Sequence, residues 1–177
     1  MTKNAREIKL DEVKLKVADV VINLNFIERE IKNCISYYVS SNKSYFVSEI
    51  LLNNHIVSMA NKIKVLQYII REEKIEIPKN FMNALQVVMN KRNVLAHSDT
   101  VLEDYTIDDV DVECEPDGVT YSPIYKDAEP GAWVFSQGDV NFDTVDKIVA
   151  DFDKYFKIAS DELARISQLL RLRFSSL

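Results

Sequence analysis

Apolar residues recur at helical spacing over most of this chain. Between residues 10 and 41 they alternate four and three positions apart, at 13, 17, 20, 24, 27, 31, 34 and 38. That alternation predicts one long helix with a narrow packing seam. Residues 45–73 continue the helical period and predict a second helix.

Two more helices are predicted further along the chain. The third extends from about Pro78 to Ser98, with Pro78 near its first turn, where a missing N–H costs least. The helical period returns at Val145 and continues to Leu170. This last long helix is expected to be capped near Asn141 to Asp143, because short polar side chains accept hydrogen bonds from the first free N–H groups.

Between these helices, from Tyr105, the apolar period changes to two. Valines at 110 and 112 and Cys114 alternate with acidic residues, and Pro116-Asp117-Gly118 predicts a turn before Val119. This pattern indicates a hairpin, and a third short strand is expected at Trp133 to Ser136. The predicted fold is mainly α, an antiparallel helical bundle of about four long helices with a small β-hairpin or three-stranded insertion before the last helix. We expect residues 1–177 to form a single domain and residues 103–140 to be an acidic, β-rich insertion within it.

Charge is concentrated in the same insertion. Residues 103–130 hold ten Asp or Glu and one Lys, a balance of −9, which leaves +3 for the rest of a chain of net charge −6. Such a segment repels a polyanion, so it is expected to face away from one, to meet a basic partner or to gate a site. Equally, its acids could form a solvated face that keeps an exposed sheet edge soluble.

Composition indicates a soluble cytoplasmic protein. Hydrophobic residues make up 47% of the chain, enough for a core, and nothing is as long as the roughly 20 apolar residues of a membrane span. Residues 1–16 mix both charges with no apolar stretch, unlike a signal peptide. Cys34 and Cys114 lack metal-ligand spacing, and reduced thiols are the simplest interpretation.

One residue interrupts the apolar face of the third helix. Phe81, Leu85, Val88, Arg92 and Leu95 follow one another at spacings of four, three, four and three, and Arg92 is the charged member. A cation removed from water costs several kcal/mol or more unless it is paired, lies at a subunit seam or meets an anionic ligand.

The residues after Arg92 favour the last two of these possibilities, a subunit seam or an anionic ligand. Asn93 and His97 are four residues apart and share a helical face. Arg92 lies about 100° around the helix axis from Asn93, and its side chain is long enough to reach towards that face. A guanidinium fork beside an imidazole that titrates near neutral pH suits phosphoryl transfer.

The sequence Arg92-Asn93-Val94-Leu95-Ala96-His97 resembles the signature of the HEPN superfamily, an Arg followed after four to six residues by His, with a polar residue often next to the Arg. The resemblance covers the helical parts, residues 8–100 and 141–174. It implies a dimeric helical bundle and, in many members, a metal-independent endoribonuclease that acts in toxin–antitoxin or antiviral defence.

The resemblance also implies roles for the residues of the motif. Two copies of the third helix would meet across a two-fold axis, with RNA in the seam. A ribose 2′-hydroxyl would attack the adjacent phosphorus, with His97 as general acid or base, Arg92 stabilising the phosphate oxygens and Asn93 in support. Neither metal nor cofactor is expected. The implied partners are RNA, a second copy of the chain, and an antitoxin or other regulatory protein.

Other interpretations of the same residues stay open. Arg92 could pair with Glu28 or Glu30 on the first helix, with His97 as a helix carboxy-terminal cation and Asn93 bonded to backbone. The motif could also belong to a non-catalytic module that binds a nucleotide, RNA or a partner's acidic residue. His55, the second histidine, has no companion at ligand spacing and is interpreted as structural.

Overall fold

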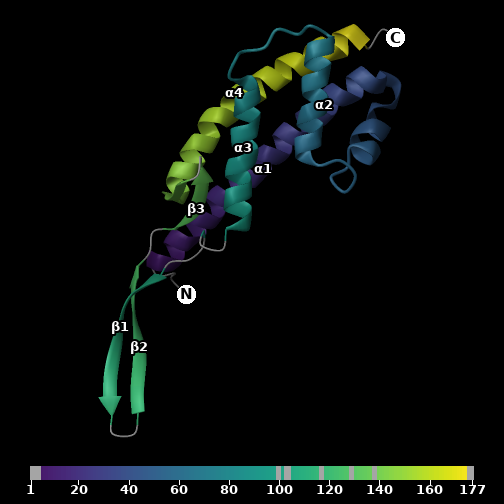
Figure 1. Ribbon diagram of the computed structural model, residues 1–177. Coiled ribbons are helices and arrows are strands. Elements are labelled where there is room, and N and C mark those ends of the chain that lie inside the picture. Colours follow the sequence, from purple (N-terminus) through teal and green to yellow (C-terminus); the bar gives the residue numbers. More distant parts are fainter. Residues whose placement is uncertain are drawn as a thin grey trace. The chain divides into compact units, whose positions relative to one another are not determined.

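The computed structural model describes residues 5–98, 101, 105–115, 118–127, 130–136 and 139–174. It is mainly helical, with strands placed before the last helix as the sequence predicts (Figure 1). The chain divides into two compact units. The first contains the described residues of Met1–Ala18 and Asn93–Val149, and the second those of Asp19–Arg92 and Ala150–Leu177.

The first and last helices match their predictions closely. Helix α1 spans Ala5–Ser40 and helix α4 spans Val145–Phe174. Most of the apolar positions that predicted each helix are buried, among them Ile27 and Ile31 of α1 and Leu163 and Leu170 of α4. The last helix does not begin at Asn141 to Asp143. Thr144 precedes it, and the Thr144 Oγ1 accepts from the Lys147 N–H at 3.3 Å.

Within the second unit, α1 and α4 run in the same direction. Phe26 lies beside Phe156 with ring centroids 6.3 Å apart, the Cys34 Sγ donates to the Leu163 carbonyl at 3.9 Å, and Tyr38 lies beside Phe174 at 5.4 Å. Residue numbers rise together along both helices. The predicted helical bundle is confirmed, but α1 and α4 are parallel to each other and not antiparallel.

The predicted second helix, 45–73, is interrupted. The chain forms a 3₁₀ turn at Ser41–Lys43 (η1), a π-helical segment at Phe46–Leu51 (η2), a turn, and then helix α2 at Met59–Glu72. Ser58 caps α2, since its side chain accepts from the Asn61 N–H at 3.4 Å. Such local hydrogen bonds compete with a continuous helix, and apolar spacing alone does not reveal them.

Helix α2 ends without glycine. Lys74 adopts a φ of 51°, the Ile75 N–H donates to the Ile70 carbonyl and the Lys74 N–H to the Arg71 carbonyl. This is the Schellman arrangement, and the buried Ile75 supplies its apolar contact. Arg165 and Arg173 of α4 then donate to the carbonyls of Glu76 and Glu73. The link between α2 and α3 is therefore fixed to α4.

The first unit contains two hairpins. Strand β1 (Tyr105–Glu115) pairs antiparallel with β2 (Gly118–Asp127), with a register shift between Ile107 and Asp109. The turn residues Pro116 and Asp117 lie outside the described residues. Strand β3 (Gly131–Ser136) contains the predicted third strand. It pairs with a fourth, β4 (Asp139–Thr144), which the sequence interpretation assigned to a helix cap.

The second hairpin depends on a close approach at Gly131. A Cβ atom there would lie 2.5 Å from the ring of Phe142 and 2.6 Å from the Asp143 carbonyl oxygen. The Phe142 ring packs edge-on against Trp133 with centroids 5.4 Å apart. Any other residue at 131 would displace this ring or the strand.

No helix in the described ranges has both the length and the apolar character that crossing a membrane requires.

Candidate functional site

Helix α3, Phe81–His97, carries all three residues of the predicted site. The predicted apolar stripe is buried at Phe81, Leu85, Val88 and Leu95, each at most 4% exposed. Arg92 occupies the remaining position and is half-buried. Its Nε atom is buried without a hydrogen-bond acceptor among the described residues, although the side chain as a whole is not free of partners.

Asn93 and His97 lie on the exposed side of the same helix. They continue a series of exposed, uncharged polar side chains at spacings of three and four, which we call the amide row. Its members are Asn83, Gln86, Asn90, Asn93 and His97. The Gln86 Nε2 donates to the Asn90 Oδ1 at 3.0 Å. The amide row therefore offers donors and acceptors without fixed charge, apart from what His97 gains on protonation.

Helical geometry relates Arg92 to His97. Five residues correspond to about 7.5 Å along the axis and about 140° around it. The two side chains thus leave the helix in different directions, and Arg92 must bend around the helix to act with His97 on one group. A guanidinium on a flexible stem can do so.

The alternative carboxylate partners of Arg92 are engaged elsewhere. Within the described residues, the ion pairs of Glu28 are with Lys62 and Lys32. Glu30 lies 3.8 Å from the Arg29 Nε and accepts from Asn33. The preceding residue, Lys91, pairs with Asp151 of α4 at 2.8 Å. The carboxylates that α1 offers to Arg92 in the structural interpretation are therefore used by other cations.

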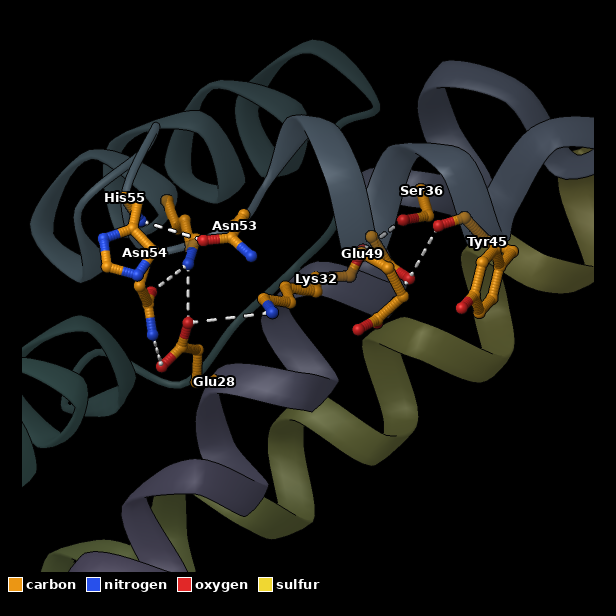
Figure 2. A network of polar contacts seen from close by, with 10 residues as sticks. Glu28, Lys32, Ser36, Tyr45, Glu49, Asn53, Asn54 and His55 are labelled. Atoms are coloured by element: carbon orange, nitrogen blue, oxygen red, sulfur yellow. Dashed lines mark hydrogen bonds and ion pairs between the residues drawn. The ribbon is translucent and has the colours of Figure 1, made fainter.

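A polar network with a buried ion pair at its centre lies in the second unit, at residues that sequence reasoning did not connect (Figure 2). Lys62 of α2 is 0% exposed, and its Nζ lies 2.5 Å from both the Glu28 Oε1 and the Asn54 Oδ1. The Asn54 Nδ2 donates to the Glu28 Oε2 at 3.1 Å, and the Lys32 Nζ lies 4.0 Å from Glu28. We call Glu28, Lys32, Asn54 and Lys62 the Glu28 cluster.

The Glu28 cluster joins three parts of the second unit: α1, the turn after η2, and α2. Its carboxylate and ammonium satisfy each other where water is excluded, which a buried charge requires. The sequence contains one sign of the Glu28 cluster, a lysine in an apolar helical stripe. Lys62 precedes Leu66 by four residues and Ile69 by seven, so it interrupts an apolar stripe just as Arg92 does.

His55 lies on the exposed turn between η2 and α2, where its backbone N–H donates to the Asn53 Oδ1 at 3.0 Å. The structural interpretation of this residue remains a prediction. In the part of the chain that the structure describes, no group of three or more His, Cys, Asp or Glu could hold a metal ion.

Cys34 is fully buried between α1 and α4. Burial, with a smaller contribution from the nearby Glu30 carboxylate, raises the pKa of its thiol to about 12. A thiol with this pKa is a poor nucleophile. The side chain of Cys114, in β1, lies outside those described.

A cavity of about 100 Å³ lies within the first unit. Its charged lining consists of Lys9, Lys16, Glu12 and Asp146, and the Lys16 Nζ lies 2.6 Å from the Asp146 Oδ1. Two cations and two carboxylates leave this cavity with no preference for an ion of either sign.

Comparison with known protein families, with curated proteins and with solved structures finds no match for this chain. The HEPN resemblance therefore remains an expectation from the sequence, centred on the motif from Arg92 to His97.

Proposed function

We propose that this protein is a metal-independent endoribonuclease of HEPN type, in which the end of α3 acts on RNA. The observation that carries the proposal is the amide row, an exposed and uncharged polar face that ends in His97 and is flanked by the half-buried Arg92. Amide side chains hydrogen-bond base edges, and unpaired RNA presents those edges openly. Arg92 supplies the positive charge that a phosphate requires.

The proposed reaction is transfer of the phosphoryl group within the RNA strand. The ribose 2′-oxygen bonds to the adjacent phosphorus while the bond from phosphorus to the 5′-oxygen breaks. A base removes the 2′-hydroxyl proton and an acid protonates the leaving 5′-oxygen, leaving a 2′,3′-cyclic phosphate and a 5′-hydroxyl. His97 performs one of these proton transfers, and Arg92 stabilises the charge on the phosphate oxygens.

The first test is cleavage of varied RNAs by purified protein in EDTA. His97→Ala is expected to slow cleavage by about 10²–10⁴-fold, the usual contribution of a general acid or base. Arg92→Ala is expected to slow it as well. His55→Ala is the matched control, because it removes the other histidine, which is also exposed but lies on a different element. Equal cleavage by the parent and a folded His97→Ala variant would show that the proposal is wrong.

Identification of the product ends sharpens the test. The reaction predicts cyclic phosphate and 5′-hydroxyl ends, which a hydrolase acting through an attacking water would not produce. Within this proposal the biological setting is toxin–antitoxin or antiviral defence, in the cytoplasm. An antitoxin or other regulatory protein would then control the activity.

A second candidate function is non-catalytic binding of a nucleotide, RNA or a partner's acidic side chain at the same residues. The segment 103–130, with its charge balance of −9, favours this alternative because it opposes the approach of a long polyanion. Retention of short RNA without cleavage, lost in Arg92→Ala, would support binding over catalysis.

A further inference from the structure

The segment η2 exposes apolar side chains over one continuous face. Tyr45 is 77% exposed, Phe46 49%, Ile50 51% and Leu51 45%. With i→i+5 geometry, positions 46, 50 and 51 project to one side, and position 45 borders them. We call these four residues the η2 surface.

Buried side chains and hydrogen bonds fix the backbone that carries the η2 surface. Val47 of the same segment and Leu52 directly after it are buried. Two residues further on, Asn54 is bonded to both Glu28 and Lys62 of the Glu28 cluster (Figure 2). These anchors fix the backbone on which the exposed side chains sit, so a partner would not have to order it.

Charge is scarce around this surface. Residues 44–58 contain one formally charged side chain, Glu49, in a chain that is 28% charged. Depletion of charge together with exposed Tyr and Phe is the composition of the core of a protein interface. A membrane-binding segment would instead carry several Lys or Arg beside its apolar residues, and this range contains none.

The exposed apolar area of the η2 surface is close to what one partner of a homodimer buries. At its exposed fractions, the surface presents roughly 400 Å² of side chain, taking about 200 Å² for a large side chain. A standard interface buries about 800 Å² per partner, of which somewhat more than half is apolar. The η2 surface thus supplies about the apolar share that one partner in a dimer needs.

The η2 surface is bordered by one cation and one carboxylate, which two copies of the chain could pair with each other. Lys43 ends η1, just before the η2 surface, and Glu49 lies within η2; both are exposed. In a two-fold contact, residue i of one copy meets residue j of the other and the reverse holds as well. Two copies can therefore form two Lys43–Glu49 pairs at the edge of one apolar contact.

We propose that the η2 surface is where two copies of this chain associate, around a two-fold axis that pairs Lys43 of each copy with Glu49 of the other. This surface differs from the α3 seam expected from the sequence. The proposal does not depend on RNA cleavage, because it rests on the apolar exposure of η2.

Sedimentation velocity of the 177-residue chain over a wide concentration series tests the proposal. The parent is expected to show a reversible monomer–dimer equilibrium, and Phe46→Asp to stay monomeric at the concentrations where the parent is a dimer. Leu172→Asp is the matched control, since Leu172 of α4 is 70% exposed and receives the same carboxylate. It should dimerise like the parent. Circular dichroism of each variant confirms that it is folded.

A charge-exchange series tests the two-fold arrangement. Lys43→Glu and Glu49→Lys should each weaken dimerisation, because each places like charges opposite one another, and the double variant should recover it. Failure of the double variant to recover would overturn the proposed pairing.

Two further results would overturn the proposal. The first is a parent that stays monomeric throughout; if that parent also sediments with phosphatidylcholine vesicles, the surface is assigned to lipid. The second is a dimer that survives Phe46→Asp but is broken by Asn90→Arg in the amide row, which would place the seam on α3.

Discussion

Two cations interrupt apolar helical stripes in this protein, and they have different surroundings. Lys62 is completely buried, and its ammonium contacts a carboxylate and an amide carbonyl within the Glu28 cluster. Arg92 is half-buried, and the polar residues that follow it, Asn93 and His97, are exposed. The same sequence signal thus marks a fully buried cation in α2 and a half-buried cation in α3. The two cases differ in how far other segments of the protein exclude water from the cation itself.

The largest expected effect is a loss of folding stability when Lys62 is removed from the Glu28 cluster. Lys62→Ala leaves the Glu28 carboxylate buried with its strongest partner removed, so the free energy of unfolding should fall by about 3–5 kcal/mol. Urea denaturation measures this change. Lys64→Ala, an exposed lysine two residues further along α2, should change it by less than about 0.5 kcal/mol. Equal losses for the two lysines would mean that the Glu28 cluster does not hold the turn after η2.

The next effect concerns the other buried titratable group of α1, Cys34. Its thiol stays protonated in the folded protein up to about pH 12, whereas the unfolded thiol ionises near pH 9.0. Between these values the unfolded state binds fewer protons, so folding stability should fall by about 1.4 kcal/mol per pH unit from this residue. Below pH 9 the residue contributes no pH dependence.

The comparison with Cys34→Ala isolates that contribution, since tyrosines and lysines titrate in the same range. The variant should lose stability less steeply between pH 9 and pH 11 than the parent does. Parallel slopes would mean that the thiol is not shielded from solvent as its position between α1 and α4 indicates.

A smaller effect is expected when the whole ion pair is replaced. Lys62→Met combined with Glu28→Leu removes both charges and keeps most of the volume, so stability should return to within about 1 kcal/mol of the parent or exceed it. Denaturation of both single variants and the double variant completes the cycle. If the double variant stays as unstable as Lys62→Ala, the amide and Lys32 contacts matter more than the charge pair.

The smallest effect on stability is expected at the end of α3. His97→Ala and Asn93→Ala remove exposed side chains and should each change the free energy of unfolding by less than about 0.5 kcal/mol. The two variants can therefore be tested for RNA cleavage without loss of fold. A loss of several kcal/mol in either would indicate a structural role and would weaken the proposed function.

Much of the fold could be predicted from periodicity. The seam of α1 and the apolar positions of α4 follow from alternating spacings of four and three, and the first hairpin follows from a spacing of two, because burial of one face dictates each pattern. The break at 52–58 was not predicted, since it depends on the Ser58 cap and on the bonds of Asn54 to distant residues. Strand β4 was missed because its partner β3 determines it, while its own residues resemble a helix cap.

Part of the candidate site could be predicted from the sequence. Arg92, Asn93 and His97 are near neighbours in the chain, so helical geometry alone relates them. The amide row was not identified, although its spacing of three and four is visible in the sequence, because polar residues at a helical period are ordinary on a solvated face. The Glu28 cluster joins residues 34 positions apart, which no local pattern relates.

By itself the sequence determined the helical character of the chain, the place of the strands before the last helix and the position of an Arg and a His on one helix, because these depend on local spacing and charge. Only the tertiary structure decided which cation is enclosed, which apolar side chains of η2 stay exposed and how α1 and α4 are oriented. Those properties depend on which distant segments exclude water from a residue, and the free energy of burial is set by that exclusion.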